Sequence, residues 1–173
     1  GSIRPSLQKK LASAQKERDE VAGFLRDSSA HFDFLFDPNR IEIVRAMPGL
    51  IGLFEQACMD VNERFGLPMP EHLLVIVLDP ASYRSDGDSW SAGKYDGRIR
   101  LPVADFFKEQ DRLVKVARHE FAHATLDRIG VQIPSWFHEG IAQLAEGSSV
   151  SEARASLHEL GTTSLSNLEG DWS

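Results

Sequence analysis

Two histidines spaced four residues apart, with a glutamate directly after the first, constrain this chain more than any other feature. The sequence there reads His119-Glu120-Phe121-Ala122-His123. On a helix, side chains at positions i and i+4 project from one face, so both imidazoles can reach a single ion. The glutamate lies one step round the helix and can contact a water on that ion without being a ligand. We therefore expect a helix here that carries a metal site on one face.

Length and composition indicate one ordinary folded domain. The chain has 173 residues, of which 42% are hydrophobic and 26% are charged, and this length is enough for a hydrophobic core. The formal net charge of -7 argues against nucleic acid as a partner, because no Lys- or Arg-rich stretch offsets it. A single cysteine, Cys58, excludes an internal disulfide.

The sequence gives few signs of a cell compartment. No run approaches the roughly 18 apolar residues of a membrane-spanning helix, and we see no signal peptide. Gly1-Ser2 resembles the remnant of a cleaved expression tag, so we expect the natural N-terminus to be missing. A soluble protein of the bacterial cytoplasm and an exported one both fit, and the oligomeric state stays open.

The pattern of apolar residues predicts an N-terminal helix followed by one mixed domain. Apolar and charged residues recur at helical spacing over 6–27. We assign 1–30 to this helix and 31–173 to the domain, with a C-terminal part that is short or truncated. In chain order we expect a strand at 31–36, a helix at 41–65 broken or kinked near Pro48, a strand at 73–78 and a hairpin over 90–101 with its turn at Asp96-Gly97. We then expect a helix that begins at about 105 or 111 and ends at 129, followed by helices at 136–146 and 149–160. Gly130 and Gly147 are expected to cap the C-terminal ends of two of these helices, and Ser135 to be the N-cap of the helix at 136–146.

A third metal ligand must come from elsewhere in the chain, because a catalytic zinc takes three protein ligands and leaves one position open for water. Geometry nominates Glu139. From His123 the helix carries the chain about 9 Å to its end, and about 6 Å of return along an antiparallel helix brings Glu139 to nearly the same level. Cys58 is distant in sequence, and His138 points about 100° away from Glu139 on the same helix.

The sequence around these residues resembles that of the gluzincin metallopeptidases. The HExxH motif is followed at 134–142 by PSWFHEGIA, which is similar to the Pro-x-Trp-x-x-Glu-Gly-x-Ala element of the bacterial peptidase MA-like group. The segment GKYDGRIRLP at 93–102 is similar to the segment before the active-site helix in that group. The resemblance spans roughly 31–147, and its sharpest motifs lie at 93–102 and 119–142.

This resemblance implies a zinc-dependent peptidase, most simply an endopeptidase, with an α+β, zincin-like fold. In that fold a small, mostly antiparallel sheet packs on the active-site helix. The resemblance implies one Zn2+ per chain bound by His119, His123 and Glu139, with Glu120 as the catalytic general base. It also implies that a polypeptide substrate in extended conformation adds to an edge strand of the sheet. That edge strand would consist of Arg98, Ile99, Arg100 and Leu101.

Two supporting roles have candidates rather than assignments. Gluzincins usually continue into a C-terminal helical subdomain that supplies a Tyr or His to stabilise the oxyanion, and no tyrosine follows the third ligand in this chain. The candidates for that role are Tyr95, His138 and His158. Asp127, one turn beyond the second histidine, is a candidate to accept a hydrogen bond from an imidazole N–H, and a solvated surface aspartate is an equal interpretation.

Two other functions remain open. One is a catalytically silent module that binds zinc and uses a peptidase-like fold as a binding or scaffold domain, which the short C-terminal part favours. Glu120 argues against it, because structural zinc sites need no general base and close all four positions. The other is a structural helix whose histidines are incidental. The substrate sequence and the choice between endo- and exopeptidase action do not follow from the residues.

Overall fold

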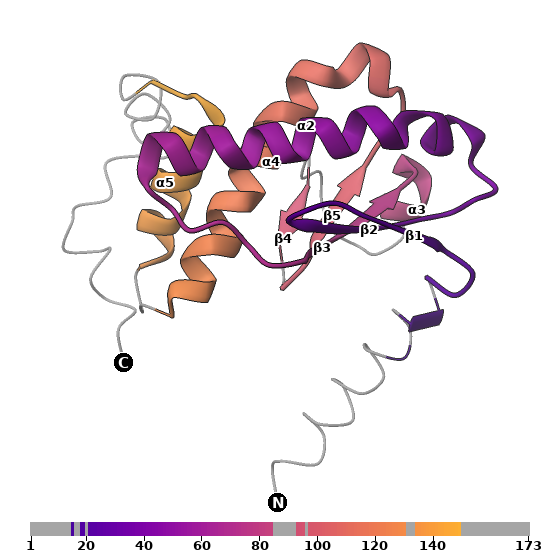
Figure 1. Ribbon diagram of the computed structural model, residues 1–173, viewed down its shortest axis with the longest axis horizontal. Helices are drawn as coiled ribbons and strands as arrows, with labels where there is room; N and C mark the ends of the chain where they lie inside the picture. The colour runs from indigo at the N-terminus through magenta and orange to yellow at the C-terminus, as the bar shows by residue number, and fades with distance from the viewer. Residues whose placement is uncertain are drawn as a thin grey trace, which may run out of the picture.

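A computed structural model describes residues 15, 18–19, 21–84, 93–95, 97–130 and 134–149 of the chain. These residues form an α+β arrangement in which helices flank a small sheet (Figure 1), as the sequence predicted. The strands are β1 (Leu25–Ser28), β2 (Phe32–Phe36), β3 (Leu73–Leu78), β4 (Lys94–Tyr95) and β5 (Ile99–Pro102). The helices are α2 (Ile41–Phe65), α3 (Pro80–Arg84), α4 (Phe106–Ile129) and α5 (Ser135–Glu146).

The sheet is mixed, and the predicted mostly antiparallel sheet is wrong. Its strand order is β1-β2-β3-β5-β4. The three central strands β2, β3 and β5 are parallel to one another, whereas β1 and β4 pair antiparallel at the two sides. Parallel neighbours need a long crossover connection, and the 25-residue helix α2 provides it between β2 and β3.

The strand that we predicted to be an edge lies inside the sheet. Arg98 precedes β5, and Ile99, Arg100 and Leu101 belong to it. Ile99 is paired with Val75 of β3 on one side and with Tyr95 of β4 on the other. The predicted hairpin between β4 and β5 is confirmed over these described residues, with its turn at Gly97 (φ +95°). Within the described sheet the edge on this side is therefore β4, which has two residues.

The N-terminal helix ends earlier than predicted, and most of the range predicted for it before residue 21 lies outside the described residues. Gln15, Arg18 and Asp19 are helical among the residues described there, and residues 21–23 form a turn. Gly23 has φ +90°, a left-handed conformation that glycine adopts without steric cost. Residues 25–28, which we predicted to be helical, form β1 on the edge of the sheet. All four β1 residues are exposed, so no alternation of apolar residues marks this strand.

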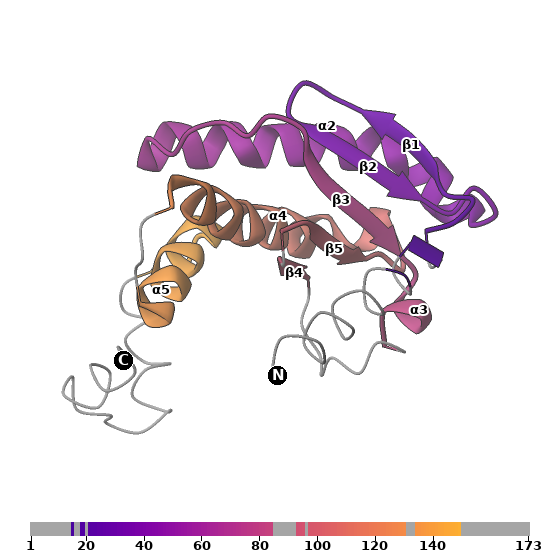
Figure 2. The ribbon, with the colours of Figure 1, turned by 90° about the horizontal axis from the view of Figure 1, so that it is seen from below.

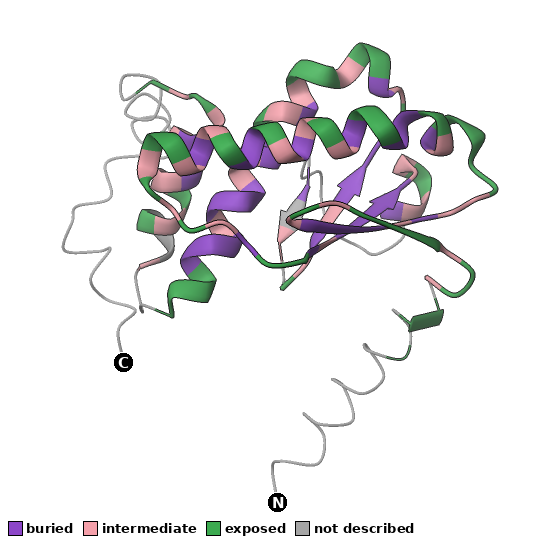
Figure 3. Ribbon diagram, in the orientation of Figure 1, coloured by how far each residue is buried: buried purple, intermediate pink, exposed green. Residues whose placement is uncertain are grey.

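The core lies between the sheet and the helices α2 and α4. Phe32 and Phe34 of β2 contact Phe54 of α2 in edge-to-face geometry, with ring centroids 5.4 and 5.5 Å apart. Burying each ring contributes roughly 1.5–3 kcal/mol. Figure 3 shows that buried residues concentrate on the central strands and on α2 and α4. Helix α2 continues through Pro48 without the predicted break, and this proline lies on the exposed side of the helix.

The helices α4 and α5 form the antiparallel pair that carries the HExxH and Trp-x-x-Glu-Gly motifs. Both views place α5 against α4, on the side of the molecule away from β1 (Figures 1 and 2). The two predicted C-terminal caps are confirmed, since Gly130 (φ +68°) ends α4 and Gly147 (φ +104°) ends α5, whereas the predicted N-cap at Ser135 is wrong. Helix α5 begins at Ser135, one residue earlier than predicted, with Pro134 at the N-cap. The helix predicted at 149–160 lies almost entirely outside the described residues.

Among the described residues, none of the helices combines the length and the apolar character that crossing a membrane requires.

Candidate metal centre

The two histidines of the motif lie on one face of α4, as their spacing predicts. No glycine or proline interrupts α4, and Leu113, Ala117, Phe121 and Ala124 bury the opposite side of the helix at helical spacing. The side chains of His119 and His123 are 21% and 16% exposed. Their Nε2 atoms lie 3.1 Å apart. Both imidazoles therefore direct the same nitrogen toward a common point at the surface.

Glu139 reaches the same point from α5. Its Oε1 lies 3.4 Å from Nε2 of His123, and its Oε2 lies 3.6 Å from Nε2 of His119. The side chain is 56% exposed, so water has access to one side of the group. The ligand atoms of the three residues all lie within 4.8 Å of one another, the only such group of three or more among the described residues.

These spacings fit a tetrahedral metal ion. Zinc–nitrogen and zinc–oxygen bonds of about 2.0–2.1 Å at tetrahedral angles separate neighbouring ligand atoms by about 3.3 Å. The separation of the two nitrogens is 3.1 Å, and the two nearest nitrogen–oxygen separations are 3.4 and 3.6 Å, measured to different oxygens of Glu139. Two imidazoles and one carboxylate are also the ligands of many catalytic zinc sites. The same donors suit other divalent transition metals, so the geometry alone does not select zinc.

Glu120 lies beside this group but is not part of it. The residue is 6% exposed, and its carboxylate accepts a hydrogen bond from the backbone N–H of Tyr95 in β4. Burial, and then the negative charge of Glu139, raise the pKa of Glu120 to about 7. Gly93 allows β4 to approach this closely, because a Cβ there would lie 2.6 Å from Cγ1 of Val116 and 3.4 Å from Oε1 of Glu120.

The far side of the His119 ring contacts a residue that the sequence analysis missed. Nδ1 of His119 lies 3.1 Å from Oε2 of Glu146, near the end of α5. Asp127, our candidate for such a contact, is exposed and accepts a hydrogen bond of 3.2 Å from the Tyr95 hydroxyl. The heptad spacing between Glu139 and Glu146 is the signal that could have identified the second glutamate, since residues seven apart share a helix face.

The structure brings two of the three oxyanion candidates close to the histidines. The ring of His138 stacks on that of His123, with centroids 6.0 Å apart and planes at 18°. Tyr95 is half-buried, and its hydroxyl bonds Asp127 one turn beyond His123. His158 lies outside the described residues. Burial, and then the neighbouring His119, lower the pKa of His123, which favours the neutral ring that binds a metal.

Comparison with known proteins adds nothing to this geometry. No protein-family model matches the chain, and no curated protein matches it. The functional interpretation therefore depends on the residues of the site and on their arrangement.

Proposed function

We propose that this protein is a zinc-dependent metallopeptidase of the gluzincin type, with a zincin-like fold, that hydrolyses peptide bonds in extended polypeptides. The observation that supports this function best is the convergence of His119, His123 and Glu139 with a buried carboxylate, Glu120, directly beside them. A site that only held a metal for stability would close all four positions. Here the three donors leave an exposed side, and a potential general base lies next to it.

In this proposal the two histidines and Glu139 hold the ion. A zinc ion bound there would lower the pKa of a coordinated water and polarise the carbonyl of the substrate. The hydrogen bond from the Tyr95 amide orients the Glu120 carboxylate. A carboxylate oxygen of Glu120 accepts the proton that the attacking water loses. Glu120 then gives this proton to the amine nitrogen as the carbon–nitrogen bond breaks.

The negative charge that develops on the carbonyl oxygen needs a donor from the protein. Tyr95 and His138 are two described residues near the histidines that can supply an O–H or N–H. We keep both as candidates. Separate Tyr95→Phe and His138→Ala variants, compared in kcat at equal zinc content, would identify which of them contributes.

The substitution Glu120→Gln tests the proposed chemistry. It keeps the size of the side chain and all three ligands, so zinc content should equal that of the wild type. Hydrolysis of unfolded casein, followed by mass spectrometry of the products, should fall by about 10²–10⁴-fold, the contribution typical of a general base. Glu63→Gln, a change at an exposed glutamate of α2, is the matched control and should leave both quantities unchanged.

Two results would count against the proposal. If Glu120→Gln keeps wild-type hydrolysis at equal zinc content, Glu120 is not the base. If the wild type binds zinc but cleaves no protein or peptide substrate, the alternative of a zinc-binding module without catalysis gains support instead.

A further inference from the structure

We infer that Glu146 is a positioning residue of the metal centre, which determines the ring nitrogen that His119 presents to the ion. The inference builds on the proposed zinc site. Nδ1 of His119 lies 3.1 Å from Oε2 of Glu146, whereas Nε2 lies 3.6 Å from Oε2 of Glu139. The two nitrogens of one imidazole thus face two carboxylates of the same helix.

The spacing along α5 explains this arrangement. Residues seven apart are separated by almost two full turns, so Glu139 and Glu146 project from the same side of α5. The His119 ring from α4 lies between them. An ionised carboxylate can only accept a hydrogen bond, so the contact with Glu146 requires the proton of His119 to reside on Nδ1. Nε2 then keeps the lone pair that a metal needs.

The end of α5 holds Glu146 in place. The Ser148 hydroxyl donates a hydrogen bond of 3.1 Å to the second oxygen of Glu146. Ser148 occupies this position because Gly147 turns the chain in a left-handed conformation, with the Ser148 amide bonded to the Gln143 carbonyl at 3.1 Å. Arg64 of α2 donates a hydrogen bond of 3.0 Å to the Leu144 carbonyl. This bond connects the same end of α5 to α2.

Glu146 contacts His119 and not His123. Within the described residues, the contacts of the His123 ring are with His119, Glu139 and His138, and none is a carboxylate at Nδ1. A general loosening of α5 would affect both rings. Loss of the Glu146 carboxylate alone should therefore change the tautomer of His119 directly, and that of His123 only through the contact between the two Nε2 atoms.

The first test measures tautomers in the metal-free full chain. Imidazole ¹⁵N chemical shifts, recorded about two units above the ordinary pKa of histidine, distinguish the two tautomers of a neutral imidazole. We expect Nδ1–H for His119 in the wild type and in Glu146→Gln, because the amide oxygen still accepts. In Glu146→Ala we expect a shift toward Nε2–H. Asp127→Ala, which removes a carboxylate that bonds Tyr95 instead, is the matched control and should leave His119 unchanged.

The second test measures zinc affinity by competition with a chelator. Glu146→Ala should weaken binding by about 10–100-fold, the range typical of residues that orient a ligand. Glu146→Gln and Ser148→Ala should weaken it less, and Asp127→Ala should not. Wild-type affinity and an unchanged His119 tautomer in Glu146→Ala would overturn the inference. A lower melting temperature without either change would also overturn it, because Glu146 would then be a purely structural contact.

The two tests separate this inference from the proposed function. If the wild type binds no zinc, the proposed function fails, and the tautomer of His119 in the metal-free protein still decides the role of Glu146.

Discussion

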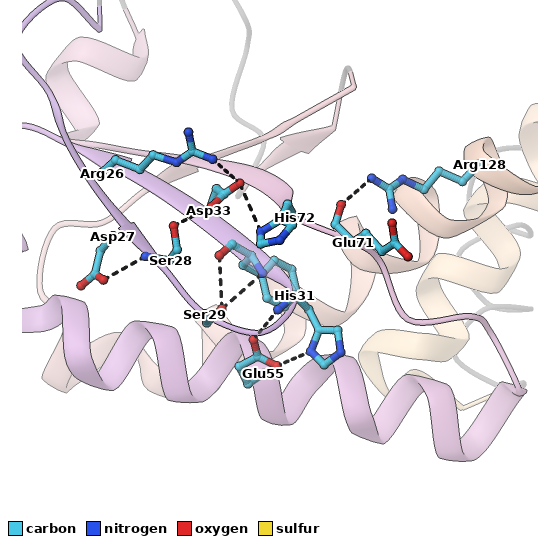
Figure 4. Close-up of polar contacts among 11 residues, drawn as sticks. Arg26, Asp27, Ser28, Ser29, His31, Asp33, Glu55, Glu71, His72 and Arg128 are labelled. Atoms are coloured by element: carbon cyan, nitrogen blue, oxygen red, sulfur yellow. Dashed lines mark hydrogen bonds and ion pairs between the residues drawn. The ribbon is translucent and has the colours of Figure 1, made fainter.

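Two groups of histidine and carboxylate side chains in this protein differ in how their members are arranged. The candidate metal centre joins His119, His123 and Glu139 from α4 and α5. The second group lies where β2 and β3 begin, and we call it the sheet cluster (Figure 4). Its members are His31, Asp33, Glu55 and His72 together with their partners Arg26, Ser28 and Ser29.

Each carboxylate of the sheet cluster is occupied by close internal partners. Asp33 accepts hydrogen bonds of 2.6 Å from both Ser28 and Arg26. Glu55 meets the ring of His31 at 2.6 Å and its backbone amide at 3.0 Å. In the metal centre the separations are 3.1–3.6 Å and converge on one point. Short, divergent pairs occupy every acceptor with an internal partner, whereas longer, convergent ones leave room for an ion between them.

Removing the metal should produce the largest difference in stability between variants of the two groups. Zinc at 100 times its Kd stabilises the folded state by about 2.7 kcal/mol, so a chelator should lower the Tm of the wild type by about 5–10 °C. Glu139→Ala should lose this response in calorimetry. Glu55→Gln, in the sheet cluster, should keep it. Equal chelator responses in the wild type and Glu139→Ala would contradict the assignment of the third ligand.

In the metal-free protein, Asp33→Ala should lower stability more than Glu139→Ala does. It removes a buried carboxylate together with its part-buried hydrogen bonds to Ser28 and Arg26, a loss of about 0.5–1.5 kcal/mol for each bond. Glu139→Ala in the metal-free protein should change stability by less than about 0.5 kcal/mol, because the side chain is mostly exposed. Urea unfolding of both variants after chelation measures the contrast. A larger loss for Glu139→Ala would show that the metal centre is itself a stabilising network.

Acid should weaken the sheet cluster progressively. The Ser28 hydroxyl and then Arg26 hold the pKa of Asp33 below its ordinary value of 3.8. Burial alone would raise the pKa of Glu55, but hydrogen bonds from Ser29 and His31 outweigh it and lower that pKa below 4.5. For a depressed carboxyl pKa, the stabilisation is complete above the unfolded value and disappears as pH falls through the folded one.

The unfolding free energy should therefore decline as pH falls below about 4.5. Asp33→Asn should make this decline shallower, since it removes one of the titrating groups, and denaturant titrations between pH 5 and the acid limit of folding would measure the slope. An unchanged slope in Asp33→Asn would mean that other carboxyls govern acid unfolding.

The sequence predicted the helical parts of the site because their signals are local. The i, i+4 histidines place themselves on one face, and Gly130 and Gly147 end the two helices that carry the ligands. Helix and loop lengths were then sufficient to bring Glu139 to the right height. Glu146 was missed because its partner is 27 residues away and no motif joins them.

The sheet was harder to predict because strand pairing is a tertiary property. The apolar run of β3 has the same pattern whether its neighbours are parallel or antiparallel, so the mixed order could not be read from it. For the same reason β5 was taken for an edge strand. The exposed residues of β1 carry no alternation, and the nearby Val21 and Phe24 extended the helical pattern across them.

The central claim is that His119, His123 and Glu139 hold one zinc ion. Elemental analysis of the purified wild type, Glu139→Ala and Glu55→Gln tests it most directly. We predict about one zinc per chain in the wild type and in Glu55→Gln, and clearly less than one in Glu139→Ala. No zinc in the wild type after reconstitution, or full zinc in Glu139→Ala, would contradict the claim.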